Sequence, residues 1–133
     1  MPQTALAPVV VYIVDSDESV RQALGRLVDA AGLATKTCDS VDALLRHAPG
    51  ARATCALLDV SGLHLCEPEV WTRLRAMAAT VPVIALSARD DPETRRIARA
   101  LGAQAFFRKP VDAAALLDSI DWVTRAEGQR GAG

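Results

Sequence analysis

The chain alternates between short apolar runs and amphipathic stretches. The run VVVYIV at residues 9–14 has no polar alternation, which is typical of a strand buried on both faces of a sheet. Residues 18–31 then carry apolar side chains at helical spacing, and Gly32 follows at the position where a left-handed residue ends a helix. The pattern therefore predicts a buried strand followed by a helix that packs against it.

The same pattern recurs four more times along the chain. Further strands are predicted at residues 33–37, 56–58, 81–86 and 105–107, and further helices after Ser40, over residues 68–78, between Asp91 and Gly102, and after Asp112. Asp91 and Pro92 form a typical helix start, because the carboxylate caps free N–H groups and proline lacks an N–H that would be unsatisfied there. Parallel strands need crossover connections, so the sequence predicts an α/β fold, a doubly wound parallel sheet of five strands.

Length and composition indicate a single domain with an aliphatic core. With 133 residues, half of them hydrophobic and few aromatic, we expect a tail at residues 1–8, one domain at residues 9–126, and a polar C-terminal tail or the start of a linker at residues 127–133. A net charge of -1 gives no overall attraction to nucleic acid or membrane. Three cysteines without a C-x-x-C motif, and no signal peptide or membrane span, favour a reduced, cytoplasmic setting.

Four polar residues fall at the predicted carboxyl ends of strands, where doubly wound proteins place their chemistry: Asp15, Asp59, Ser87 and Lys109. Taken singly, an aspartate or serine after a strand often only caps the next helix. Together, two carboxylates, a hydroxyl and an ammonium group could hold a divalent cation beside a phosphoryl group. An aspartate in that setting can act as a nucleophile and form an aspartyl phosphate.

Four stretches in register carry a family resemblance: VYIVDSDESVRQALGRLVDAAG, ALLDV, VPVIALSARDD and ALGAQAFFRKPVD. With them the chain resembles the receiver domains of bacterial two-component response regulators, most of all those of the FixJ kind. The resemblance implies a (βα)5 flavodoxin-like fold with strand order 2-1-3-4-5. It also implies a signalling domain rather than an enzyme, which takes a phosphoryl group from a histidine kinase.

The resemblance also implies roles for single residues. Asp59 matches the phosphoacceptor, Ser87 and Lys109 match the residues that engage the phosphoryl group, and Phe106 matches an aromatic switch position, although a plain core aromatic is an equal alternative. Asp15, Asp59 and the backbone carbonyl of Ser61 match the ligands of Mg²⁺, and Pro110 follows a peptide bond that is cis in the family. For partners, it implies a homodimer through the helix between Asp91 and Gly102, the strand at 105–107 and the last helix, and contact with DNA only through an output domain beyond these residues.

The acidic pocket is atypical, because Ser16 stands where the family usually has a second metal-binding acid. One unit charge about 4 Å from a dication contributes roughly 8 kcal/mol of gross attraction at an effective dielectric near 20, much of it cancelled by desolvation. We therefore expect weakened Mg²⁺ binding, with Ser16 a weak ligand or none. The loop after Asp59 also departs from the family, with Leu63 and Glu67 where proline and glycine are common.

Two other functions fit parts of the sequence. A pseudo-receiver would use the same fold as a phosphorylation-independent interaction module, which Ser16 and the unusual loop favour. The stretch DSDES also approximates the D-x-D pattern of haloacid-dehalogenase-type phosphatases, with Asp15 as nucleophile and Asp17 as acid. That assignment leaves Asp59 without a role.

Overall fold

A computed structural model describes residues 9–47 and 54–132, so the tail expected at residues 1–8 lies outside the described part of the chain. The strands are β1 (Val10–Val14), β2 (Ala34–Cys38), β3 (Thr54–Asp59), β4 (Val83–Ser87) and β5 (Ala105–Arg108). They form one parallel sheet in the order β2-β1-β3-β4-β5. The predicted fold class and strand order are both confirmed.

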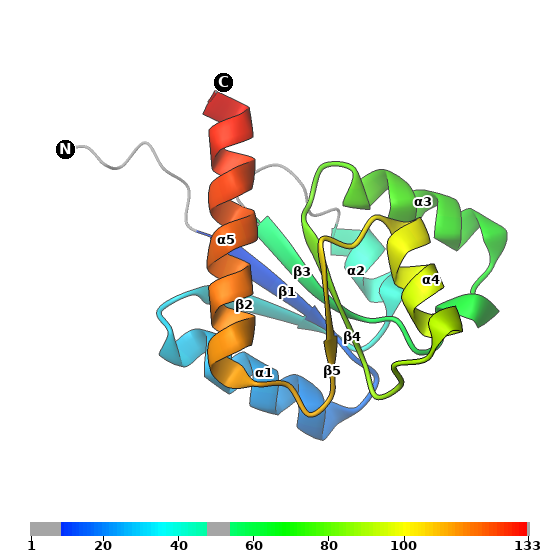
Figure 1. Cartoon of the computed structure of the whole chain (residues 1–133), viewed down its shortest axis with the longest axis horizontal. Coiled ribbons are helices and arrows are strands. Elements are labelled where there is room, and N and C mark those ends of the chain that lie inside the picture. The colour runs from blue at the N-terminus through cyan, green and yellow to red at the C-terminus, as the bar shows by residue number, and fades with distance from the viewer. Residues whose placement is uncertain (1–8, 48–53, 133) are drawn as a thin grey trace.

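Helices cover both faces of the sheet (Figure 1). On one face lie α1 (Glu18–Ala30) and α5 (Ala113–Ala132), and on the other lie α2 (Val41–His47), α3 (Pro68–Ala78) and α4 (Pro92–Leu101). A short 3-10 helix, η2 (Leu63–Leu65), precedes α3. Across the described segments, we find no helix with the length and apolar character needed to span a bilayer.

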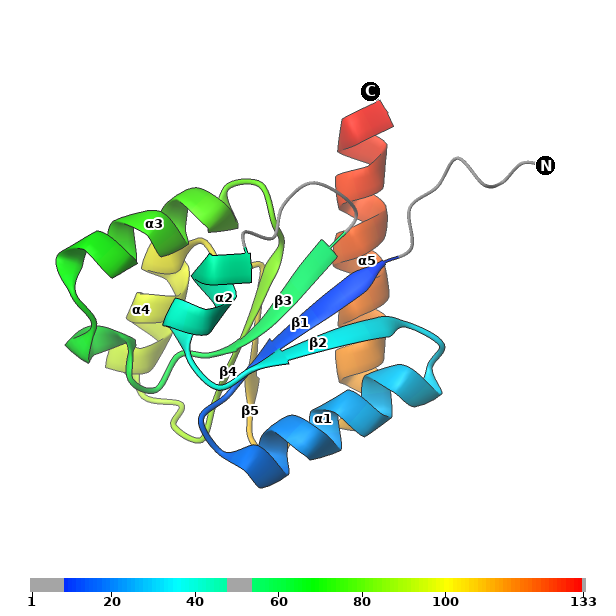
Figure 2. The ribbon, with the colours of Figure 1, turned by 180° about the vertical axis from the view of Figure 1, so that it is seen from behind.

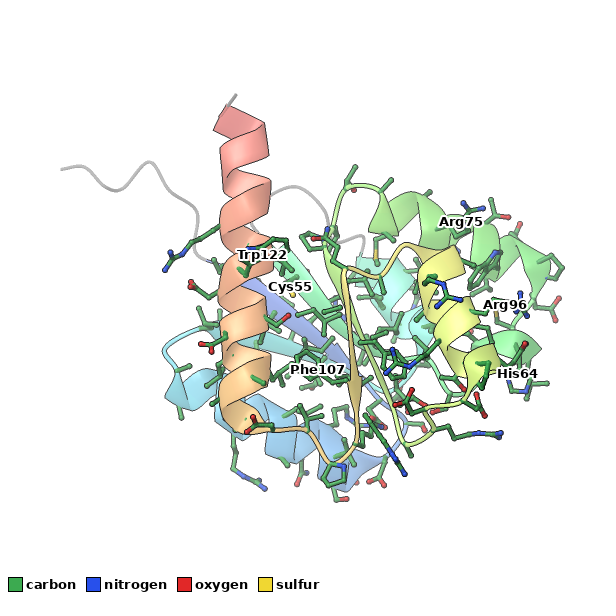
Figure 3. All side chains as sticks on the ribbon, in the orientation of Figure 1. Cys55, His64, Arg75, Arg96, Phe107 and Trp122 are labelled. Atoms are coloured by element: carbon green, nitrogen blue, oxygen red, sulfur yellow. The ribbon has the colours of Figure 1, made fainter. Side chains whose placement is uncertain are left out.

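Burial of the central strands β1, β3 and β4 on both faces explains their apolar runs. Successive side chains of a strand point to opposite faces, so Ile13 joins the core under α1 and α5 while Val14 joins the core under α2, α3 and α4. Cys55 and Phe107, marked in Figure 3, belong to the core on the α1 and α5 side. Both faces therefore need apolar residues, and no polar alternation remains.

Two boundaries differ from the sequence prediction. The fourth strand begins at Val83 rather than at residue 81, because the Val81 N–H donates to the Met77 carbonyl at 2.8 Å and so belongs to the end of α3. The last helix continues to Ala132, so the backbone of residues 127–132, which we expected to be a tail or linker, is helical.

The carboxyl ends of the strands meet at one edge of the sheet, where the chain turns from each strand into the next helix (Figure 2). Backbone hydrogen bonds tie the first residues beyond β1, β3 and β5 to the neighbouring strands. The N–H groups of Asp15, Val60 and Lys109 donate to the carbonyls of Cys38, Leu86 and Ser87, at 3.2, 2.9 and 2.8 Å. This edge is therefore a fixed platform for the side chains that follow the strands.

Candidate functional site

Lys109 lies between two carboxylates at this edge. Its Nζ atom is 2.5 Å from Oδ2 of Asp15 and 3.2 Å from Oδ2 of Asp59. The exposed fractions of the Lys109, Asp15 and Asp59 side chains are 16%, 1% and 17%, so water screens these ion pairs only weakly. Burial by itself lowers the pKa of Lys109, but the hydrogen bond to Asp15 and the charges of Asp59 and Asp15 outweigh it and raise the pKa above its ordinary value. The ammonium group is therefore charged at neutral pH.

Asp15 is held in place from several directions. Its Oδ1 atom accepts the backbone N–H of Asp17 at 2.9 Å, and its backbone carbonyl accepts a hydrogen bond of 2.6 Å from Nη1 of Arg21. The side chain itself is buried. These contacts fix the direction of the carboxylate, which is aimed at Lys109.

Asp17 serves the helix rather than the site. Its Oδ1 atom accepts the N–H groups of Ser19 and Val20 at 2.9 and 3.3 Å and so caps α1. The hydroxyl of Ser19 also donates to this carboxylate at 2.7 Å, and this bond, with the two N–H groups, lowers the pKa of Asp17. With its carboxylate used in this way, Asp17 does not replace the acid missing at position 16.

A cavity of about 470 Å³ opens beside the two aspartates. Asp15, Ser16, Asp59 and Ser61 contribute to its lining, together with the loop and η2 residues up to Cys66. His64, marked in Figure 3, is in this part of the lining. The exposed Ser16 borders this cavity, which is where the resemblance implies that a metal ion binds.

The hydroxyls of Ser61 and Ser87 extend the site toward β4. Both the N–H and the hydroxyl of Ser61 donate to Oδ1 of Asp59, at 2.9 and 2.6 Å. Oγ of Ser61 is 3.3 Å from Oγ of Ser87, whose side chain is fully buried, and Oγ of Ser87 accepts the backbone N–H of Arg89 at 3.0 Å. The sequence predicted a role only for the Ser61 carbonyl, although an aspartate side chain commonly accepts the backbone N–H two residues on.

Phe106 is half-buried on β5 and packs against the core beneath α4. The guanidinium carbon of Arg95 is 4.9 Å from the centre of the Phe106 ring, within the range of a cation–π contact. Arg95 also makes two hydrogen bonds to the Asp90 carboxylate in the loop after β4. The sequence did not predict this contact, because it depends on how α4 packs against β5.

The remaining site residue is Pro110, and the Lys109–Pro110 peptide bond is cis, the isomer that the resemblance implies. Within the described residues, no three side chains of Asp, Glu, His or Cys form a group that could hold a metal ion. The acidic pocket therefore offers two carboxylates, from Asp15 and Asp59, and any further ligands must come from hydroxyls, backbone carbonyls or water.

Sequence comparisons identify one family. The pattern of the response regulator receiver domain matches residues 11–121. The transcriptional regulatory protein FixJ of Bradyrhizobium diazoefficiens is 29% identical over 102 residues, which cover 77% of this chain and 50% of FixJ. The response regulator protein TmoT of Ectopseudomonas mendocina is 33% identical over 111 residues, which cover 84% of this chain and 50% of TmoT. The chain thus spans about half the length of these curated relatives.

Solved structures agree with these matches. The response regulator StyR superposes with a TM-score of 0.79 and 31% identity, covering 95% of this chain and 64% of the StyR chain. The FixJ-N structure gives a TM-score of 0.73 with 25% identity, covering 90% of this chain and 96% of FixJ-N. The Vibrio cholerae chemotaxis protein CheY4, at 24% identity and a TM-score of 0.71 over 88% of this chain and 99% of its own, shares the fold. The matched residues, the strand order and these structures together show that the chain belongs to the family of response regulator receiver domains.

Proposed function

We propose that this receiver domain accepts a phosphoryl group on Asp59 from the phosphohistidine of a histidine kinase. The observation that carries this proposal is the contact of Lys109 Nζ with the carboxylates of both Asp15 and Asp59 beside an open cavity. In the reaction, a carboxylate oxygen of Asp59 attacks phosphorus, a P–O bond forms and the P–N bond breaks. The imidazole leaves with the electron pair of that bond and takes up a proton from water.

Lys109 and Ser87 have the chemistry to receive the transferred group. The ammonium group already contacts both carboxylates, so it would lie close to a phosphoryl group attached to Asp59. A charge-assisted hydrogen bond from this lysine is stronger than a neutral one. The Ser87 hydroxyl lies on the neighbouring strand and is fixed by the Arg89 N–H, so it can donate to a phosphoryl oxygen after a small rotation.

The residues present fit a Mg²⁺ ion, with fewer charges than the family usually provides. A carboxylate can accept about four hydrogen bonds or ligands, and Asp15 and Asp59 each have capacity left beside their present partners. Mg²⁺ commonly takes one or two carboxylates and completes its shell with water and phosphate oxygens. Asp15, Asp59 and the Ser61 carbonyl would hold the ion, which would supply positive charge to the phosphoryl oxygens.

The consequence of phosphorylation would be a change at the surface of α4, β5 and α5. We propose that this surface forms a homodimer, and that Phe106 reports the state of the site to it. The matched residues cover only half of FixJ and of TmoT, which are named as a transcriptional regulatory protein and a response regulator protein. Contact with DNA would therefore belong to an output domain outside these residues.

Phosphorylation can be tested by intact mass. The chain is incubated with acetyl phosphate, or with a phosphorylated kinase, in the presence of Mg²⁺. We expect one added phosphate that is absent in Asp59→Asn and retained in Asp118→Asn, which alters an exposed carboxylate on α5. If no adduct forms with either donor, or if the Asp59 variant still gains one, the proposal is wrong.

Neither alternative function gains support. The comparisons do not favour a pseudo-receiver over a phosphoacceptor. A phosphatase of the haloacid-dehalogenase type would need Asp17 as an acid, and its carboxylate caps α1 instead.

A further inference from the structure

Ser61 connects the phosphoacceptor to the strand that carries Ser87. The loop that bears it is fixed on both sides, because the Val60 N–H donates to the Leu86 carbonyl at 2.9 Å and the Leu63 N–H donates to the Val60 carbonyl at 3.2 Å. Val60 and Leu63 are both buried. The Ser61 hydroxyl is thus presented to the edge of the sheet by an anchored backbone.

The donors and acceptors around Ser61 can be assigned by elimination. The Asp59 carboxylate can only accept, so the Ser61 hydroxyl must donate its single proton to Oδ1. In the 3.3 Å contact with Ser87, the Ser87 hydroxyl is then the donor and Ser61 the acceptor. Ser87 in turn accepts the N–H of Arg89. A directional chain of hydrogen bonds runs from the Arg89 amide through both hydroxyls to Asp59.

These hydrogen bonds use the only proton of the Ser87 hydroxyl. Ser87 would need the same proton to donate a hydrogen bond to a phosphoryl oxygen. While Asp59 is a free carboxylate, its charge strengthens the bond from Ser61 and, through it, the orientation of Ser87. Attachment of a phosphoryl group to either oxygen of Asp59 removes that charge or blocks Oδ1. The hydrogen bond from Ser61 to Asp59 is then weakened. The charged phosphoryl oxygens are stronger acceptors for the Ser87 hydroxyl than the neutral Ser61 oxygen.

We propose that Ser61 is a positioning residue that holds the Ser87 hydroxyl away from the phosphoryl site while Asp59 is unmodified and releases it once Asp59 carries a phosphoryl group. This inference rests on the proposed function of Asp59 and describes its regulation. It assigns the Ser61 side chain a role distinct from that of its backbone carbonyl. The Ser87 hydroxyl, which this step releases, also accepts the Arg89 N–H, in the loop that leads into α4.

The test compares binding of beryllofluoride, a phosphoryl mimic, with Mg²⁺ present. We expect Ser61→Ala to bind it about three to ten times more tightly than the wild type, since one hydrogen bond no longer competes for Ser87. Ser61→Thr keeps the hydroxyl and should stay close to the wild type. In a Ser87→Ala background, Ser61→Ala should have almost no effect, which a merely structural role of Ser61 would not produce.

A second measurement needs no phosphoryl mimic. The amide proton of Arg89 should exchange faster with solvent in Ser61→Ala than in the wild type or in Ser61→Thr, because Ser87 is no longer held as its acceptor. The inference is wrong if Ser61→Ala changes beryllofluoride binding equally in the wild type and in the Ser87→Ala background, or if Ser61→Thr behaves like Ser61→Ala. Either result would leave the proposed function of Asp59 intact. Failure of the wild type to bind beryllofluoride would instead overturn the proposed function, and the release step with it.

Discussion

Lys109 forms ion pairs with two aspartates, one of which has almost no access to water. The Asp15 side chain is 1% exposed, and its Oδ2 atom has the lysine Nζ at 2.5 Å. An ionised carboxylate in such a place is stable only when it is paired and hydrogen-bonded. The same ammonium group therefore supports the fold at this edge, and in the proposed function it would also pair with the phosphoryl group.

Replacing this lysine should affect stability and phosphorylation together. We expect Lys109→Met to lower the free energy of unfolding by about 3 kcal/mol, because Asp15 is left buried without its partner. Phosphorylation should slow by about tenfold or more through loss of the charge that faces the phosphoryl group. Urea denaturation and intact mass measure the two effects. Arg96→Met, which removes an exposed ion pair with Glu93, should change stability by less than about 1 kcal/mol; equal losses in the two variants would contradict the assignment.

The serine at position 16 makes a second prediction at this scale. Ser16 borders the cavity next to Asp15, so Ser16→Asp adds a carboxylate where a cation is expected. We expect Mg²⁺ to bind about tenfold more tightly, which is a small part of the gross attraction because desolvation opposes it. Isothermal titration calorimetry gives the affinity. Ser16→Asn has the same shape without the charge and should leave the affinity unchanged, and an equal gain in both variants would show that charge is not the cause.

Among the elements, α4 directly follows the loop that begins after Ser87. Asp91 caps its start by accepting the Thr94 N–H at 2.8 Å, and Gly102 ends it with a φ of 100°. Between these ends, Arg95 joins the loop residue Asp90 to the ring of Phe106. The bounds of α4 are therefore set by its two capping residues, while Ala98 and Leu101 pack it on the core and Arg95 links it to β5.

The role of the left-handed conformation of Gly102 at the end of α4 can be tested by adding a single methyl group. We expect Gly102→Ala to lower the free energy of unfolding by about 1 kcal/mol, because an L-residue with a side chain disfavours the left-handed conformation. No atom lies within 4 Å of the added Cβ, so the effect comes from the backbone alone. Gly62→Ala is the matched control, since Gly62 has a φ of -103° and equally open surroundings. Urea denaturation of the two variants should separate them, and equal stabilities would refute the argument.

The sequence predicted those features of the elements that neighbouring residues determine, and missed those that depend on tertiary packing. The buried strand at residues 9–14 and the cap formed by Asp91 and Pro92 were predicted because burial on both faces and capping leave direct marks in the sequence. The start of β4 was misplaced because Val81 is apolar, but its N–H is hydrogen-bonded to Met77 at the end of α3. The side-chain bonds of Ser61 and the contact of Arg95 with Phe106 depend on how a loop and a helix pack, and no local pattern records that.

For the molecule as a whole, one buried thiol ties global stability to pH. Burial raises the pKa of Cys55 from 9.0 to about 12. The unfolded chain loses this proton near pH 9 whereas the folded chain keeps it, so the contribution of the neutral thiol is complete below pH 9 and is lost as the pH rises toward 12. We expect the free energy of unfolding to fall by about 1.4 kcal/mol per pH unit in this range from this group. Urea denaturation under reducing conditions should show a shallower slope for Cys55→Ala, and an unchanged slope would exclude Cys55 as the source.

The proposed dimer is also a property of the whole molecule. Charged residues on α4, β5 and α5 suggest how the surfaces of two copies would face each other. Arg99 on α4 and Arg108 on β5 are exposed and make no ion pair within the described residues. Asp118 is exposed on α5, and the nearby Trp122 has 64% of its surface exposed and is marked on α5 in Figure 3. In a two-fold interface each patch is used twice, so arginines of one copy can face the aspartate of the other around an aromatic centre.

We therefore expect the chain to be a monomer without a phosphoryl mimic and a dimer with beryllofluoride and Mg²⁺, as measured by sedimentation equilibrium. Arg99→Glu and Asp118→Arg should each weaken the dimer by about tenfold, because like charges then face each other across the two-fold axis. The double variant Arg99→Glu with Asp118→Arg restores opposite charges and should recover most of the affinity. If the two single effects simply add in the double variant, these residues do not meet, and if beryllofluoride leaves the wild type monomeric, this surface is not a phosphorylation-dependent interface between copies.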